Sequence, residues 1–157
     1  MSKIAPCLWF GGNAEEAVTF YVGTFPNSRI GIVSRAEVET PGRKSGDVLF
    51  MAFEMDGRPF TALNGPPLFK FSEALSLTVT CETQDEIDRI WFRLCDGGSE
   101  GQCGWLKDRY GLSWQIVPAI MGTLMTGAPD RTQRVMAAMM KMRKLDIEAP
   151  RNAAEQE

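Results

Sequence analysis

The chain contains no histidine among its 157 residues. Histidine is the most frequent metal ligand in proteins and a common general base, so every site that needs an imidazole is excluded. The same absence removes the usual partner that activates a cysteine nucleophile, which argues against a catalytic role for Cys103. Any chemistry of this protein must therefore use other side chains.

Three further absences narrow the functional class. The four cysteines form no CxxC pair, so we expect reduced thiols and a cytoplasmic protein. No apolar run approaches the roughly 18 to 20 residues that cross a bilayer, so we expect no membrane role. The 20 acidic and 17 basic residues are intermixed, which argues against nucleic-acid binding. We expect a small-molecule ligand or a protein partner instead.

One order of predicted elements occurs twice in the chain. The first copy has a strand at residues 4–10, a helix from Asn13, and strands at 29–35, 48–55 and 59–63. The second copy has a strand at 75–81, a helix from Thr83, and strands at 99–102, 104–107 and 112–117. Asn13 and Thr83 are each followed three residues later by glutamate, which is the capping-box pattern of a helix N-terminus. The pattern predicts an α+β protein of two βαβββ modules, about residues 3–66 and 74–118.

A last helix is predicted from Asp130, with methionines at helical spacing. Such a stripe is more often ordinary packing than a surface for a partner subunit, and both interpretations stay open. We predict one domain over residues 1–147, consisting of the two modules and this helix, and a flexible polar tail at 148–157.

Several short motifs resemble those of the vicinal oxygen chelate superfamily, which includes glyoxalases, bleomycin-resistance proteins and extradiol dioxygenases. They are Pro6-Cys7-Leu8-Trp9-Phe10, Ala14-Glu15-Glu16-Ala17, Phe20-Tyr21, Phe25-Pro26-Asn27-Ser28, Ala62-Leu63-Asn64-Gly65, Cys103-Gly104-Trp105, Lys107-Asp108-Arg109-Tyr110-Gly111 and Trp114-Gln115-Ile116-Val117-Pro118. The match is closest to the PhnB-like branch, often labelled a 3-demethylubiquinone-9 3-methyltransferase domain. The resemblance implies two modules that each wrap a four-stranded sheet into a cup.

The resemblance also implies a divalent metal held by histidine and glutamate on the first, fourth, fifth and eighth strands. In this chain those positions fall on Pro6, on Ala62 or Asn64, on or next to Ser76, and on Gln115. A hydroxyl and amides cannot compete with water for a transition metal. We therefore expect no metal and no other cofactor.

Strand alternation identifies the side chains on the inner face of the cups. It predicts a polar, uncharged face with candidate ligand-binding residues Asn64, Ser76, Thr78, Trp105, Ser113 and Gln115, and with Phe60, Phe69 and Trp105 as apolar walls. The alternative is a solvated sheet face with no ligand. Trp9 and Trp91 are expected to pack helix against sheet. Asp108 begins a tight turn and is expected to bind its own backbone.

The resulting hypothesis is a metal-free small-molecule-binding protein, homodimeric and cytoplasmic. One alternative is an enzyme of the same superfamily, either a lyase, isomerase or dioxygenase using carboxylates such as Glu54, Glu73 or Glu82, or a methyltransferase as the branch label suggests. Against methyl transfer, Gly11-Gly12 lacks the third glycine of a loop for a nucleotide-like cofactor such as S-adenosylmethionine. Another alternative is a scaffold that binds partners through the methionine-rich helix.

Overall fold

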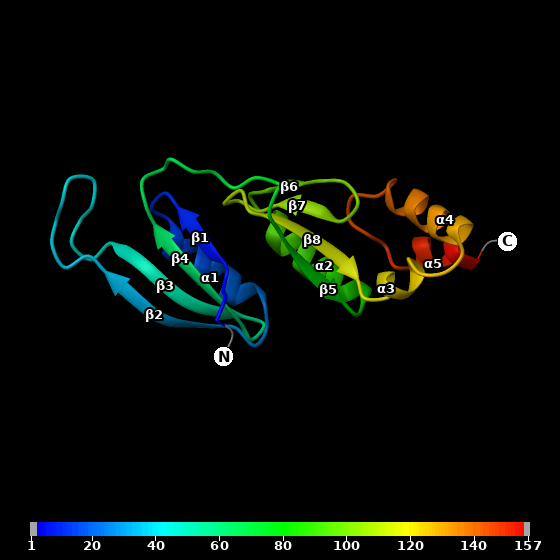
Figure 1. The fold of residues 1–157 in the computed structure, drawn as a ribbon, viewed down its shortest axis with the longest axis horizontal. Helices are drawn as coiled ribbons and strands as arrows, with labels where there is room; N and C mark the ends of the chain where they lie inside the picture. The colour runs from blue at the N-terminus through cyan, green and yellow to red at the C-terminus, as the bar shows by residue number, and fades with distance from the viewer. Residues whose placement is uncertain (1–2, 156–157) are drawn as a thin grey trace. The chain divides into compact units, whose positions relative to one another are not determined.

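The computed structural model describes residues 3–155, and these form two compact units that divide between Lys70 and Phe71. Each unit contains one four-stranded mixed sheet with a helix against it, as the α+β prediction requires (Figure 1). Among the described residues, none of the helices combines the length and the apolar character needed to span a bilayer. The two units are described one at a time.

The first unit places its strands in the order β1-β4-β3-β2. The elements are β1 (Cys7–Phe10), α1 (Ala14–Thr24), β2 (Arg29–Arg35), β3 (Val48–Met55) and β4 (Arg58–Asn64). β1 is parallel to β4, and the remaining pairs are antiparallel. α1 covers one face of the sheet, where Leu8, Tyr21 and Met51 are at most 1% exposed (Figure 1). Burial of these apolar side chains holds the helix on the sheet.

The capping of α1 differs from the prediction. The side chain of Asn13 makes no capping hydrogen bond. Instead, Oδ1 of Asn64, at the end of β4, accepts hydrogen bonds from the backbone N–H groups of Gly12 and Ala14, at 3.2 and 2.9 Å. The N-terminus of this helix is thus satisfied by a residue fifty positions away. A local sequence pattern could not show this contact.

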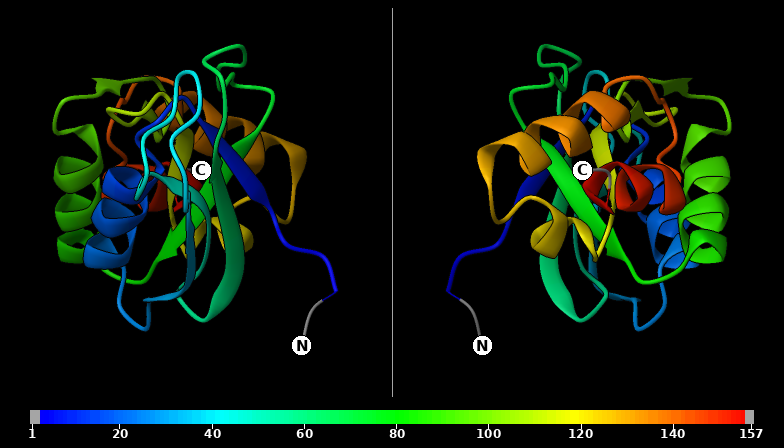
Figure 2. Two further views of the ribbon diagram at one scale, coloured as in Figure 1. Left: turned by 90° about the vertical axis from the view of Figure 1, so that its left-hand side faces the viewer. Right: turned by 90° about the vertical axis from the view of Figure 1, so that its right-hand side faces the viewer.

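The second unit repeats the topology of the first, with strand order β5-β8-β7-β6. Its elements are β5 (Ser76–Cys81), α2 (Gln84–Cys95), β6 (Ser99–Glu100), β7 (Trp105–Lys107) and β8 (Ser113–Pro118). Here the predicted cap forms, because Thr83 Oγ1 accepts from the Glu86 N–H at 3.2 Å. α2 packs on one face of the sheet (Figure 2). Trp91 and Trp114 are at most 1% exposed in this core. The predicted duplication is confirmed.

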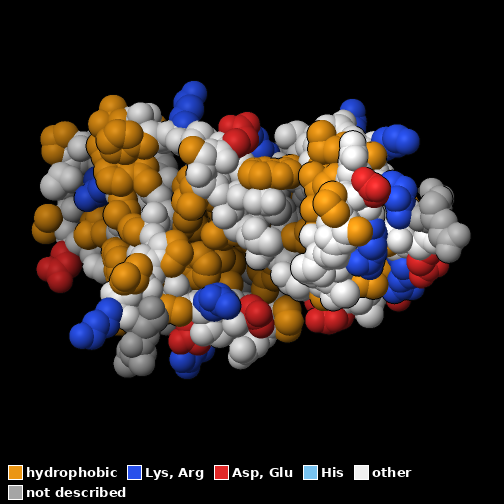
Figure 3. Space-filling view, turned by 45° about the vertical axis from the view of Figure 1, so that its right-hand side comes forward, with side chains coloured by type: hydrophobic (Ala, Val, Ile, Leu, Met, Phe, Trp, Pro, Cys, Tyr) orange, Lys and Arg blue, Asp and Glu red, His pale blue; other side chains and the backbone are white. Residues whose placement is uncertain are grey.

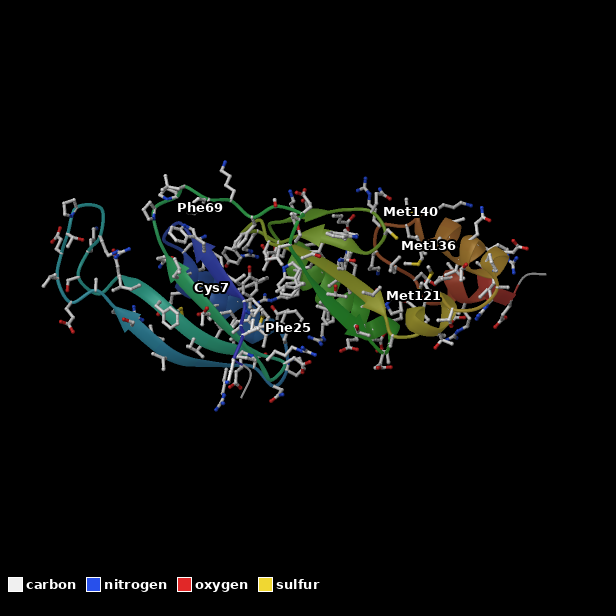
Figure 4. All side chains as sticks on the ribbon, in the orientation of Figure 1. Cys7, Phe25, Phe69, Met121, Met136 and Met140 are labelled. Atoms are coloured by element: carbon white, nitrogen blue, oxygen red, sulfur yellow. The ribbon has the colours of Figure 1, made fainter. Side chains whose placement is uncertain are left out.

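Beyond β8 the chain forms α3 (Met121–Leu124), α4 (Pro129–Met139) and α5 (Glu148–Glu155). They share a small core of Met121, Leu124, Val135, Met139 and Leu145. The predicted methionine stripe is therefore partly buried and partly exposed. Met139 is buried, whereas Met136 and Met140 are 40% and 60% exposed. Figure 4 labels these two exposed methionines.

α5 is a correction to the flexible tail predicted at 148–157. Residues 148–155 are helical, and Arg134 Nε donates to the carbonyl oxygen of Ala153 at 3.1 Å. The last two residues of the predicted tail lie outside the described part of the chain. Ala149, Pro150, Ala153 and Ala154 recur at helical spacing and give this segment a less exposed face.

The segment between α4 and α5 is bound to the second module. Its carbonyl groups at Met142 and Arg143 accept hydrogen bonds from the Cys103 and Gly104 N–H groups, each at 2.7 Å. Gln84 adds two more, donating to Leu145 O and accepting from the Ile147 N–H. The C-terminal extension is therefore part of the second unit's hydrogen-bonded structure.

The face of the first sheet opposite α1 carries the apolar side chains of Trp9, Leu63 and Phe50 together with the Arg29–Glu54 ion pair. Trp9 lies on this face, half-buried, with its ring edge-to-face against Phe69 at 5.1 Å and its Nε1–H donating to Pro66 O. The prediction that Trp9 packs between helix and sheet is wrong, because the buried neighbours Leu8 and Phe10 occupy the helix side. Figure 3 shows hydrophobic side chains gathered over the first unit, with charged side chains more frequent over the C-terminal helices.

Candidate functional site

The open face of the second sheet, opposite α2, brings together five of the predicted ligand-binding residues. The strand register places Ser76 beside Ser113, and Gln115 between Thr78 and Trp105. All five side chains share one face, because paired residues in neighbouring strands point the same way. The other face is apolar and buried, with Trp114 and Ile116 at most 1% exposed. The alternation predicted from the sequence is confirmed here.

Two of these polar side chains bind each other. Gln115 Nε2 donates to Ser76 Oγ at 2.9 Å, across the parallel pair β5 and β8. This bond fixes the orientation of the amide and leaves the Gln115 carbonyl oxygen without a partner among residues 3–155. The pair therefore offers a positioned acceptor on the open face.

Ser113 is the most unusual residue on this face. It is 1% exposed, yet its Oγ has no hydrogen-bond partner among the described residues. A buried hydroxyl without a partner costs about 1 to 3 kcal/mol, so proteins rarely keep one without a reason. Ser113 lines a cavity of about 250 Å³ together with Trp105 and Lys107. The hydroxyl is therefore an unused hydrogen-bonding group in the wall of this cavity.

An ion pair lies at the rim of this cavity. Lys107 Nζ is 2.5 Å from Glu73 Oε1, and the hydrogen bond from Lys107 lowers the pKa of the Glu73 carboxyl. Both side chains line the cavity and both are substantially exposed. The sequence indicates no role for Lys107, because a lone lysine in a strand carries no signal of its partner.

Asp108 has a structural role, as predicted. It is 3% exposed, and its Oδ1 accepts from the backbone N–H groups of Tyr110 and Leu112 at 2.8 and 3.1 Å. Its Oδ2 accepts from Trp114 Nε1 at 2.8 Å. The carboxylate therefore holds the turn between β7 and β8 and the indole beneath it.

Asn64 lies in the first unit, and its side chain is used by the fold. Besides the two bonds to the start of α1, its Nδ2 donates to Val48 O at 2.9 Å. A ligand would have to compete with these bonds, so the binding role of Asn64 stays a prediction. The predicted apolar wall Phe60 is instead a core residue, 8% exposed and stacked on Phe53 at 5.6 Å.

The donors at the metal positions implied by the fold do not suit a divalent cation. Ser76 and Gln115 are a hydroxyl and an amide that bind each other, and Ala62 is fully buried. Within residues 3–155 no three His, Cys, Asp or Glu side chains are grouped so that they could hold a metal ion. Neutral donors of this kind leave the charge of the ion uncompensated.

Two of the three carboxylates considered for a displaced metal site, Glu54 and Glu73, have other partners. Glu54 is bound by Arg29 at 2.7 Å, and Glu73 by Lys107, and each cation lowers the pKa of its carboxyl partner. Burial raises the pKa of the Cys103 thiol, which disfavours the thiolate that a nucleophile requires. These residues therefore offer no metal cluster and no activated nucleophile.

Comparison with known proteins agrees with this fold. The family model described as 3-demethylubiquinone-9 3-methyltransferase matches residues 2–117. The chain belongs to this family. The PhnB protein of Bacillus cereus is 38% identical over 75% of this chain and 100% of its own, with a TM-score of 0.70. No functionally curated protein shows significant similarity to the chain.

More distant structures share the fold alone. Protein PA1353 of Pseudomonas aeruginosa is 19% identical, covering 75% of this chain and 98% of its own, with a TM-score of 0.58. The fosfomycin resistance protein FosX of Listeria monocytogenes, complexed with Mn(II) and sulfate, is 11% identical over 84% of this chain and 95% of its own, with a TM-score of 0.51. The family member described here thus has the vicinal oxygen chelate fold, as the sequence motifs predict.

Proposed function

We propose that this member of the family is a metal-free binding protein that holds a small polar molecule on the open face of the second sheet. The observation that carries the proposal is the buried, unpartnered Oγ of Ser113 beside Trp105 and the Lys107–Glu73 pair. The hydroxyl and the Gln115 carbonyl oxygen supply specific hydrogen bonds, and the indole of Trp105 supplies an apolar wall. The histidine-free donor set supports binding without a metal.

Replacing Ser113 by alanine separates binding from folding. Because the hydroxyl has no partner among residues 3–155, Ser113→Ala should leave the free energy of unfolding unchanged or slightly increased. A ligand that uses the hydroxyl should bind about tenfold more weakly to the variant. Ser34→Ala, at an exposed serine of β2, is the matched control.

The measurement is a thermal-shift screen of small polar and aromatic compounds, followed by calorimetric titration of each compound that stabilises the protein. A loss of thermal stability in the free Ser113→Ala variant would show that the hydroxyl has a structural partner after all. Equal affinities of both serine variants for every stabilising compound would place the binding site elsewhere.

The metal-free part of the proposal has its own test. The full chain is dialysed against Mn(II), Ni(II), Zn(II) and Fe(II) salts, and tightly held metal is measured by mass spectrometry. The Listeria monocytogenes FosX protein, whose structure contains Mn(II), is the positive control. We expect metal well below one equivalent per chain; a stoichiometric ion that is lost in a Gln115→Ala variant would refute this part.

Methyl transfer is the second candidate, favoured by the family description alone. A nucleotide-like methyl donor usually sits on free backbone N–H groups where a strand leads into a helix. Here the Gly12 and Ala14 N–H groups at that position already donate to Asn64, so they do not fit such a donor. Calorimetric titration with S-adenosylmethionine tests this candidate, and tight binding would favour it over the first proposal.

We also propose that the protein is a cytoplasmic homodimer. The exposed Met136 on α4 and Met140 at the C-cap of α4 support an association surface, because methionine adapts its shape to a partner. Light scattering of the full chain gives the oligomeric state, and a monomer at micromolar concentration would contradict this proposal.

A further inference from the structure

The first unit contains a second cavity, of about 640 Å³, that the proposed function does not use. It lies where the β1–α1 connection, the loop of residues 36–47 and the chain after β4 meet, so all of its lining residues belong to the first unit. Its volume is in the range of pockets that hold small metabolites. Five of its lining residues are glycines: Gly11, Gly12, Gly42, Gly46 and Gly65. Walls without side chains let a ligand approach the backbone.

One wall of the cavity is an internally neutralised ion pair. Both terminal nitrogens of Arg35 donate to the carboxylate of Glu15, and Nη1 also donates to Gly46 O at 3.1 Å. The hydrogen bond from Arg35 lowers the pKa of the Glu15 carboxyl, so this group is charged at neutral pH. The guanidinium of Arg35 thus already has partners within the protein, and its bonds join the loop at Gly46 to the start of α1.

Arg43 lines the same cavity but, unlike Arg35, has no carboxylate partner among the described residues. It is half-buried, and its Nη2 donates to the carbonyl oxygen of Asn64 at 3.1 Å. A guanidinium has five N–H donors, and within residues 3–155 no carboxylate pairs with this one. The bond to Asn64 O positions the fork while leaving most of its donors and its charge available.

We infer that this cavity binds a small molecule through an oxyanion group, a carboxylate or a phosphate, held by Arg43. The planar guanidinium fork matches the geometry of both groups, which makes such pairs stronger than neutral hydrogen bonds. The neighbouring glycine backbones leave room for the group beside Arg43. This inference is independent of the proposed function, whose residues lie in the second unit.

The test uses the full chain and two probes, inorganic phosphate and acetate, titrated separately at constant ionic strength with sodium chloride. Nuclear magnetic resonance follows the backbone N–H signals of Gly12, Gly42 and Gly46 and the Arg43 Nε–H signal. We expect saturable shifts of these signals with at least one probe. The probe that binds more tightly distinguishes a phosphate ligand from a carboxylate ligand.

Two neighbouring variants give the specificity of the site. Arg43→Gln should weaken binding about tenfold, whereas Lys44→Gln removes an adjacent exposed charge outside the cavity lining and should bind like wild type. Arg43→Lys keeps the positive charge but lacks the planar guanidinium, so it should bind the probe with intermediate affinity. If Arg43→Gln does not fold, Arg43→Lys is compared with Lys44→Gln instead. Equal weakening by Arg43→Gln and Lys44→Gln, or no saturable shift with either probe, would overturn the inference.

Discussion

Replacing Asp108 by asparagine should destabilise the second unit although the side chain hardly changes in size. The carboxylate is 3% exposed and accepts hydrogen bonds from the backbone N–H groups of Tyr110 and Leu112 and from the Trp114 indole. Asparagine has one acceptor oxygen, and its amide nitrogen carries two donors of its own. In either orientation of the amide, at least one buried donor faces another donor.

The magnitude follows from the number of bonds lost. A hydrogen bond to a charged group contributes about 1.5 to 3 kcal/mol, and a buried donor left without a partner costs a similar amount. We therefore expect Asp108→Asn to lower the free energy of unfolding by about 2 to 4 kcal/mol. Asp108→Ala leaves all three donors unpaired and should cost at least as much.

This loss of stability is measured by urea unfolding, with tryptophan fluorescence and circular dichroism as the two probes. The midpoint should fall while the slope stays the same, because the surface exposed on unfolding does not change. Asp56→Asn is the control: it makes the same chemical change in the exposed β3–β4 turn, where φ is 46° and asparagine is well tolerated. If Asp108→Asn were as stable as the control, the carboxylate would not be holding this turn.

Two more predictions follow from particular contacts. Asn64→Ala should lower the free energy of unfolding by about 2 to 3 kcal/mol, since it removes the hydrogen bonds that join α1 and β3 to the end of β4. Asn13→Ala should cost little, because the Asn13 side chain makes no capping hydrogen bond. A larger loss of stability for Asn13→Ala than for Asn64→Ala in urea unfolding would contradict the cap assignment. Burial raises the pKa of Cys81 to about 12, so at pH 8.5 iodoacetamide should modify the exposed Cys7 rapidly and Cys81 only on unfolding, as peptide mass spectrometry can show. Because the pKa of Cys81 is higher in the folded protein than in the unfolded chain, the contribution of this thiol to stability is fully present below about pH 9. This contribution is lost as the pH rises towards 12, because the thiol then ionises in the unfolded chain and stays protonated in the folded protein. Equal alkylation of Cys7 and Cys81 in the native protein would refute the burial argument.

Local chemistry in the sequence was enough for the order of elements and for the duplication. Thr83 caps its helix as the pattern predicts, and the side chain of Asp108 binds its own turn. Strand alternation also separated the polar side chains of Ser76 and Gln115 from the buried side chains of their own strands, because the two-residue period of a strand needs no knowledge of its neighbours. Such features depend on residues within a few positions of one another.

Contacts between distant residues were decided by the tertiary structure alone. Asn13 and Asn64 are both plausible caps by residue type, yet only the parallel pairing of β1 with β4 brings Asn64 to the start of α1. The burial of Ser113 and the pairing of Lys107 with Glu73 depend in the same way on which segments meet. The sequence by itself determined the two modules, the order of their elements along the chain and the absence of an imidazole site. Which polar atoms are already occupied, and which stay available to a ligand, depends on desolvation and on long-range contacts, and these exist only once the chain has folded.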